Sequence, residues 1–154
     1  MALHGCLNLR NKASIPIENC ESINVGGYLA AFLEIYKVYT LEGKKLPDFD
    51  WFELFEKKAK IDLRVLVESM YGVNPWKKET EEEIEEKWRS VDKVIAATTE
   101  LLQLLPLLKQ PNFFFTPQNT IPAFEALLDT LKQCQNLGEK EVRIEFCSSV
   151  VGLH

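Results

Sequence analysis

The densest group of ionisable side chains in the sequence is an acidic run in residues 81–86. Carboxylates grouped in this way can hold a magnesium ion for phosphate hydrolysis, or they can present an acidic surface to a basic partner. A hydrolase of the all-helical kind would need a second acidic helix facing the run, and only Glu125 and Asp129 are candidates for it. We therefore interpret the run as a candidate partner-binding surface, made by Glu81, Glu82, Glu85 and Glu86.

Histidine is scarce, which bears directly on nucleophilic catalysis. The two histidines, His4 and His154, lie close to the two ends of the sequence, where side chains are commonly poorly ordered. A Ser-His-Asp or Cys-His system needs an imidazole that its neighbours hold rigidly. The sequence therefore predicts no catalytic residues and no enzyme activity.

The chain contains four cysteines, Cys6, Cys20, Cys134 and Cys147. No two of them have the Cys-x-x-Cys spacing of a zinc or redox motif, so reduced thiols are expected. If the two ends of the chain paired, the cysteines near each end and the two histidines could together bind zinc. Because no motif spacing supports such a site, we expect no metal and no other cofactor.

Two aromatic sites are further candidates for anchoring a partner. Phe113, Phe114 and Phe115 are consecutive, so they cannot all point into one core, and at least one is expected near the surface. The alternative is a loop that covers one end of the core. Trp76, in the turn beside Pro75, has the same two interpretations. All four aromatic residues are therefore included among the candidate partner-binding residues.

Length and composition place the chain in an ordinary globular class. Its 154 residues suit a single domain, and a composition of 46% hydrophobic and 27% charged residues excludes disordered and collagen-like proteins. The formal net charge of −5 argues against nucleic-acid binding, which favours a basic surface. We therefore expect one domain over residues 1–154, with another protein and not a nucleic acid as its partner.

Neither a membrane anchor nor a secretory signal is evident in the sequence. No apolar run reaches the roughly 18 to 20 residues that a membrane-spanning helix requires. The N-terminal segment lacks the basic start and the apolar stretch of a signal peptide. These features predict a cytoplasmic protein that has no membrane partner.

Alternating apolar residues indicate strands at the two ends of the chain. Leucines alternate with polar side chains over residues 1–10, and Val142, Ile144 and Phe146 recur at every second position near the other end. A lone strand cannot satisfy its backbone hydrogen-bonding groups in an apolar setting. The two terminal segments are therefore expected to pair with each other.

Between these strands the periodicity predicts four or five helices. Their expected bounds, set by capping residues, glycines and prolines, are about 22–41, 48–60, 63–72, 80–105 and 120–138. The boundary near Ile61 and Asp62 is open, because the second and third segments could also form one helix. Pro122 is expected in the first turn of the last helix, where its missing N–H is tolerated.

The segment 80–105 has the clearest helical pattern. Thr80 and Glu83 have the spacing of a capping box, and the acids of the first turn suit the positive end of a helix dipole. Apolar residues then recur with helical spacing at Ile84, Trp88, Val91, Ile95, Leu102 and Leu105, with Thr98 in the same line. This heptad seam predicts one long helix that packs against a partner helix, and Pro106 is expected to kink or end it.

Together these patterns predict a mainly α protein, an antiparallel bundle of four or five helices with a short β pair formed by the N- and C-terminal segments. The expected function is a non-enzymatic protein-binding or regulatory module, one version of which is an acidic inhibitor or immunity-type protein. Two alternatives stay open. One is a homo-oligomeric structural component in which a second copy completes the heptad seam, and the other is a small metal-dependent hydrolase that uses residues 81–86.

Overall fold

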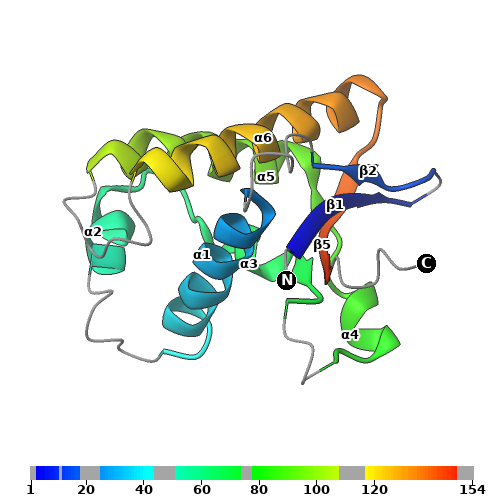
Figure 1. Ribbon diagram of the computed structural model, residues 1–154, viewed down its shortest axis with the longest axis horizontal. Coiled ribbons are helices and arrows are strands. Elements are labelled where there is room, and N and C mark those ends of the chain that lie inside the picture. The colour runs from blue at the N-terminus through cyan, green and yellow to red at the C-terminus, as the bar shows by residue number, and fades with distance from the viewer. Residues whose placement is uncertain are drawn as a thin grey trace.

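The computed structural model describes residues 3–10, 12–17, 25–43, 51–73, 78–107 and 117–148. Helices α5 (Val91–Leu104) and α6 (Pro117–Asn136) lie side by side along one side of the molecule, with α1 (Val25–Thr40) and α3 (Arg64–Glu68) packed against them (Figure 1). Helix α2 (Trp51–Lys58) lies at the end remote from the sheet. The short helix α4 (Glu81–Glu85) lies on the side of the sheet away from α5 and α6.

The sheet combines the two ends of the chain with three two-residue strands from between them. β1 (Leu3–Leu9) and β5 (Glu141–Ser148) form its antiparallel centre. The short strands are β2 (Ile15–Pro16) on the free edge of β1, β3 (Met70–Tyr71) parallel to β5, and β4 (Arg89–Ser90) antiparallel to β5. The strand order is β2-β1-β5-β3, with β4 also paired to β5.

The predicted antiparallel helical bundle with only a short β pair is wrong, because the sheet has five strands of mixed direction. The predicted pairing of the terminal segments is confirmed by the register of β1 and β5. The other strands were not predicted, because two residues are too few to show an alternating pattern. In addition, β3 continues an apolar stretch whose spacing predicts a helix. Gly72 then turns the chain out of β3 with a φ of +86°, where a Cβ atom would clash with the carbonyl oxygen of Phe146.

Residues 80–105 form two helices and not the predicted long one. The capping box of Thr80 and Glu83 is confirmed, but α4 has only five residues. β4 then pairs with β5, and Ser90 caps α5 by accepting a hydrogen bond from the backbone N–H of Lys93 (3.4 Å). Helical spacing of apolar residues continues across this break, which is why the sequence pattern alone predicts a single helix.

The predicted heptad seam is therefore not a continuous stripe. The fully buried residues of α5 are Val91, Val94, Ala97, Thr98, Leu101 and Leu104. Ile95 and Leu102, which belong to the predicted seam, are only partly buried. The core-facing stripe therefore combines Val91 and Thr98 of that seam with the flanking Val94, Leu101 and Leu104. An intermolecular zipper along the seam would need one straight helix, and α4 and α5 do not form one.

The bounds of α1 and α2 lie within three residues of those expected, but α3 ends at Glu68 and not near residue 72 as predicted, because Met70 and Tyr71 form β3. The start of α6 also differs from the prediction. This helix begins at Pro117, so Pro122 lies inside it and not in its first turn as predicted. The chain leaves the helix near Gly138, which has a φ of +83° and was expected to end it. The open boundary between the second and third segments is a true break, because α2 ends at Lys58 and α3 begins at Arg64.

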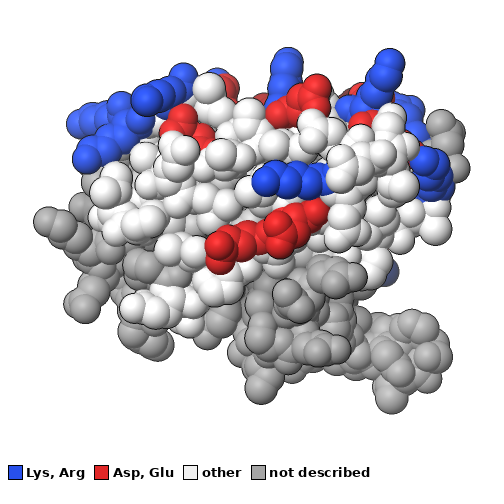
Figure 2. Space-filling view, turned by 90° about the horizontal axis from the view of Figure 1, so that it is seen from above, with Lys and Arg blue, Asp and Glu red and all other residues white. Residues whose placement is uncertain are grey.

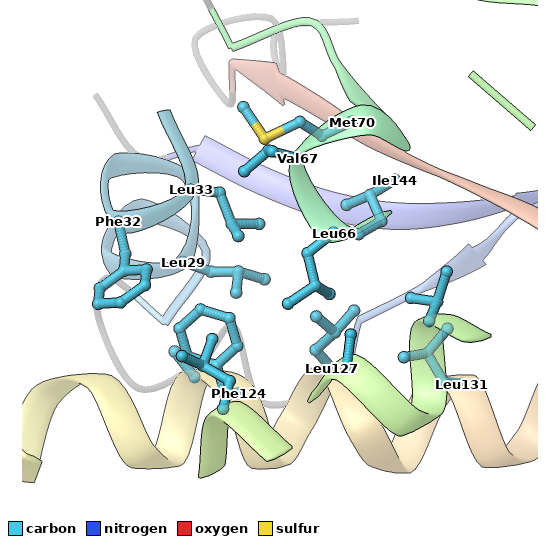
Figure 3. Packing of buried hydrophobic residues seen from close by; sticks show 14 of the residues in the cluster. Leu29, Phe32, Leu33, Leu66, Val67, Met70, Phe124, Leu127, Leu131 and Ile144 are labelled. Carbon is cyan, nitrogen blue, oxygen red and sulfur yellow. The ribbon is translucent and has the colours of Figure 1, made fainter. Parts of the chain in front are cut away.

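The core lies between the helices and one face of the sheet (Figure 3). Its labelled members are Leu29, Phe32 and Leu33 of α1, Leu66 and Val67 of α3, Phe124, Leu127 and Leu131 of α6, and Met70 and Ile144 of the sheet. All of these residues are at most 2% exposed. Full burial of each such side chain contributes about 1.5 to 3 kcal/mol to folding. None of the described helices is long and apolar enough to cross a membrane.

Candidate functional site

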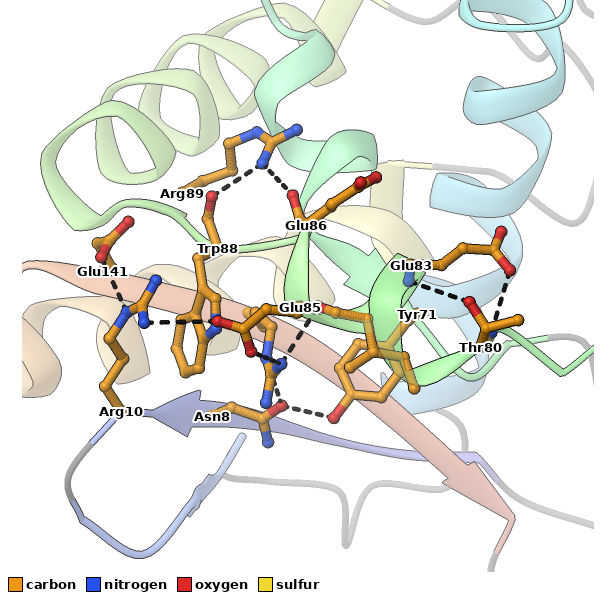
Figure 4. A network of polar contacts seen from close by, with 12 residues as sticks. Asn8, Arg10, Tyr71, Thr80, Glu83, Glu85, Glu86, Trp88, Arg89 and Glu141 are labelled. Atoms are coloured by element: carbon orange, nitrogen blue, oxygen red, sulfur yellow. Dashed lines mark hydrogen bonds and ion pairs between the residues drawn. The ribbon is translucent and has the colours of Figure 1, made fainter.

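The outer face of the sheet, away from the helical core, carries polar and aromatic side chains. Alternation along β1 buries Leu7 and Leu9 and leaves Asn8 and Arg10 on the other face. The same alternation along β5 buries every second side chain and leaves its charged residues outside. The outer residues that contact one another form the sheet-face cluster, namely Asn8, Arg10, Tyr71, Glu85, Trp88, Glu141, Arg143 and Glu145. Figure 4 labels six of them, Asn8, Arg10, Tyr71, Glu85, Trp88 and Glu141.

Asn8 is the centre of the hydrogen bonds in the sheet-face cluster. It is only 6% exposed and lies opposite Arg143 in the register of β1 and β5. Its amide oxygen accepts hydrogen bonds from the Tyr71 hydroxyl and from Nε of Arg143 (3.2 Å). Its amide nitrogen donates to the Ser14 hydroxyl (2.9 Å) and to the Glu145 carboxylate (3.1 Å). The hydrogen-bonding capacity of the Asn8 side chain is thereby filled.

Arg143 is held between two aromatic rings. Its Cζ atom lies 4.0 Å from the centroid of the Trp88 ring and 5.4 Å from the centroid of the Tyr71 ring. Both distances are within the range of cation–π attraction. Nη1 donates to the backbone carbonyl of Ile84 (3.1 Å) and lies 3.8 Å from the Glu85 carboxylate. The guanidinium therefore supports the last turn of α4, where backbone carbonyls lack partners inside the helix.

Arg10 supplies a second cation next to the Trp88 ring. Its Nε donates to the Glu141 carboxylate (2.9 Å), and its Nη1 lies 3.5 Å from the Glu85 carboxylate. Its Cζ lies 4.7 Å from the centroid of the Trp88 ring. Helix α4 contains no fully buried residue. Glu85 and the neighbouring Trp88 therefore hold it against the sheet by contacts with both guanidiniums (Figure 4).

The Tyr71 hydroxyl has a hydrogen-bond partner in the cluster, whereas the indole nitrogen of Trp88 has none among the described residues. Burial, followed by the negative charge of Glu145, raises the pKa of Tyr71 to about 12, so the hydroxyl stays protonated and donates to Asn8. The indole Nε1 of Trp88 is buried and has no hydrogen-bond partner among the described residues. A buried unpaired donor is unfavourable, and the cation–π contacts on the Trp88 ring offset that cost.

The contacts of the sheet-face cluster suit it to holding α4 in place. Its ionised groups neutralise one another, since both guanidiniums are paired with Glu85 and Arg10 is also paired with Glu141. The Cys6 thiol donates to the Glu145 carboxylate (3.3 Å). Within the part of the chain that is described, no group of three or more histidine, cysteine, aspartate or glutamate side chains is arranged to hold a metal ion. We therefore interpret the cluster as a structural clamp.

The acidic residues predicted to bind a partner fall into two groups. Glu85 is engaged by the sheet-face cluster. Glu81, Glu82 and Glu86 are exposed, and their carboxylates form no ion pair with any described residue. Figure 4 shows the side chain of Glu86 directed away from that of Glu85. Three carboxylates on an anchored helix are thus accessible to a partner.

The remaining predictions concern the aromatic candidates and the second pair of acids. Trp76 and the segment Phe113, Phe114 and Phe115 lie outside the described residues. The two acids that a hydrolase would need, on α6, are exposed on the far side of the core. Figure 2 looks onto that side, where acidic and basic side chains are interspersed among neutral ones.

Sequence reasoning missed the cations and the tryptophan of the sheet-face cluster. The periodicity places Trp88 in a helical seam, whereas it packs on two arginines of the sheet. A signal was nevertheless present in the strands. Asn8 and Arg10 alternate with buried leucines, and Arg143 lies between Val142 and Ile144, which are both fully buried. Polar side chains at these positions indicate the outer face of the strand pair, although the same pattern is typical of a face open to solvent.

Comparisons with known proteins indicate no function for this chain. No family model matches the chain, and neither the curated proteins nor the solved structures contain a match to it. The function is therefore argued from the geometry and charge of the described residues.

Proposed function

We propose that the protein is a non-enzymatic protein-binding module whose acidic helix α4 contacts a basic partner. One observation carries this proposal. Helix α4 is anchored to the sheet through Glu85, while Glu81, Glu82 and Glu86 are exposed and unpaired within the described part of the chain. Charges on an anchored element lose little conformational freedom when a partner binds, so more of their interaction energy is expressed as affinity.

The overall charge supports the same proposal. A formal net charge of −5 attracts a cationic protein and accelerates its association. An inhibitor or immunity-type protein is the specific form that we favour, in which α4 covers a basic site on its target. We also infer a cytoplasmic location, and the reduced thiols of Cys6 and Cys134 support that inference.

The proposal is tested by purifying the protein from native lysate as wild type and as the double variant Glu82→Gln/Glu86→Gln. A basic protein should co-elute with the wild type, and its recovery with the variant should fall on the order of tenfold. Raising the salt from about 0.05 to about 0.5 M should also release it, because exposed charge pairs are screened. Mass spectrometry of the eluate identifies and quantifies the partner.

The matched control is Glu125→Gln/Asp129→Asn, which removes the same number of charges from exposed positions on α6. This control should retain the partner as well as the wild type does. Equal recovery with all three forms would show that α4 is not the contact surface. Equal loss with both variants would show that only the net charge matters.

A further inference from the structure

A pocket of about 340 Å³ opens between the end of α1, the end of α2 and the start of α3. None of its lining residues belongs to the sheet or to α4. Its volume falls at the lower end of the range of roughly 300 to 1,000 Å³ that small-ligand pockets span. The residues that give it chemical character are Tyr36, Glu56, Ile61, Asp62, Leu63 and Arg64.

Tyr36 is a nearly buried residue that brings a polar group to this pocket. The residue is 1% exposed, and its ring stacks on Phe52 with centroids 4.9 Å apart. Its hydroxyl has no hydrogen-bond partner among the described residues. The nearby Thr40 hydroxyl does not supply one, because it donates to the backbone carbonyl of Tyr36 (2.9 Å). The hydroxyl is not among the fully buried atoms that lack a partner, so it can be reached from the pocket, where a ligand can occupy its open hydrogen-bonding position.

The charged residues of the lining indicate the sign of that ligand. Arg64 is paired with Asp62, with Nη2 donating at 2.8 Å and Nε at 3.0 and 3.1 Å to its carboxylate. Glu56 is exposed and is the only charged lining residue without a partner in the described part of the chain. The pocket therefore presents one unneutralised carboxylate.

The electrostatic environment of Tyr36 agrees with this assignment. Burial, and then the charges of Glu56 and Asp62, hold the pKa of Tyr36 above its ordinary value. The hydroxyl is therefore neutral, and its oxygen can accept a hydrogen bond from a cation. An anionic ligand would be repelled by the unpaired Glu56, whereas a cation would neutralise it.

We propose that this pocket binds an alkylammonium group, which donates hydrogen bonds to the Glu56 carboxylate and to the Tyr36 hydroxyl oxygen while its alkyl chain lies along Ile61 and Leu63. The chemistry is shared by a small free amine and by a lysine side chain of another protein. The site is separate from α4, so it does not depend on the proposed binding of a basic partner by the acidic helix.

The direct test is a titration of the isotope-labelled protein with n-butylammonium, followed by the amide signals in NMR spectra. Saturable shifts should appear at the lining residues between Ala59 and Arg64. n-Butanol has the same alkyl chain without the charge, and butyrate has the opposite charge. Both should bind on the order of tenfold or more weakly, because neither can neutralise Glu56.

Two substitutions locate the binding groups. Tyr36→Phe removes only the hydroxyl and keeps the stacked ring, and Glu56→Gln removes only the charge. Each should weaken n-butylammonium binding on the order of tenfold. Tyr39→Phe and Glu53→Gln are the matched controls on the same two helices, and neither residue lines the pocket. Both controls, and Glu82→Gln/Glu86→Gln, should bind as the wild type does.

A parallel titration with Nα-acetyl-lysine N-methylamide distinguishes the two sources of the alkylammonium group, a lysine side chain and a small free amine. Tighter binding of this compound than of n-butylammonium assigns the pocket to a lysine side chain, and weaker binding assigns it to a free amine. Either result supports the alkylammonium site. The proposal is overturned if no saturable shift occurs, if n-butanol binds equally well, or if Tyr36→Phe and Glu56→Gln leave the affinity unchanged.

Discussion

The two faces of the β1–β5 strand pair are held by different interactions, although they are made by alternating residues of the same two strands. On the inner face Leu7 and Ile144 are fully buried against the helices. On the outer face Asn8 and Arg143 are covered by directional hydrogen bonds and by the Trp88 ring. Apolar burial is non-directional and stabilises the whole domain, whereas directional contacts determine where one element sits.

The difference matters most for α4. This helix has no fully buried residue, so apolar burial cannot position it. Its place depends on contacts from Arg10 and Arg143 to Glu85, and from Arg143 to the Ile84 carbonyl. Disturbing the inner face should therefore unfold the protein, while disturbing the outer face should release the acidic helix from a domain that stays folded.

The largest effect is expected from Ile144→Ala on the inner face. Ile144 is fully buried between Leu7 of β1 and Met70 of β3, so the substitution leaves a cavity and should lower the free energy of unfolding by about 2 to 5 kcal/mol. Urea denaturation measures this change. Lys140→Ala, at an exposed position just before β5, should change it by less than about 0.5 kcal/mol. A cost for Ile144→Ala below about 1 kcal/mol would mean that the inner face does not dominate stability.

Arg143→Met should have an intermediate effect on the outer face. Methionine keeps apolar contact with Trp88 but removes the donors to Asn8 and Ile84, which should lower the free energy of unfolding by about 1 to 3 kcal/mol. Hydrogen exchange should quicken at the amides of α4 more than at those of α5. Lys132→Met, exposed on α6, is the matched control. Uniform acceleration of exchange across both helices would contradict a separate role for the outer face.

Tyr71→Phe should cost about 1 kcal/mol near neutral pH, because it removes one hydrogen bond to Asn8. The raised pKa makes this difference depend on pH. Above pH 10, the ordinary value, the unfolded state loses the Tyr71 proton while the folded state keeps it, so the wild type loses stability as the pH rises through about 12. The advantage of wild type over variant should therefore shrink across this window. A difference that stays constant to pH 12 would show that the hydroxyl is not held in its neutral form.

The smallest effect is expected from Glu85→Gln. The side chain is 65% exposed, and its two ion pairs with Arg10 and Arg143 are 3.5 and 3.8 Å long. Exposed pairs of this kind contribute about 0 to 1 kcal/mol, and salt weakens them. The difference in unfolding free energy from wild type should vanish at high salt. Glu86→Gln removes a carboxylate without an ion pair in the described residues and should show no such salt dependence.

Several features were determined by the sequence itself, because they depend on neighbours along the chain. Alternation predicted the terminal strands and which of their faces is apolar, as the burial of Leu7 and Ile144 confirms. The Thr80 and Glu83 spacing predicted the start of α4, and the capping box is present. A cap and a period-two pattern are complete within a few residues, so no distant contact is needed to specify them.

Tertiary structure alone decided the short strands, the break before α5 and the composition of both sites. β3 and β4 exist because β5, distant in the sequence, offers them hydrogen-bonding partners, and two residues carry no periodicity of their own. The contact of Trp88 with Arg143 depends on strand register. The pocket that Tyr36 and Glu56 both line depends on helix packing. Periodicity shows which face of an element is apolar, but it does not show which other element covers the opposite face.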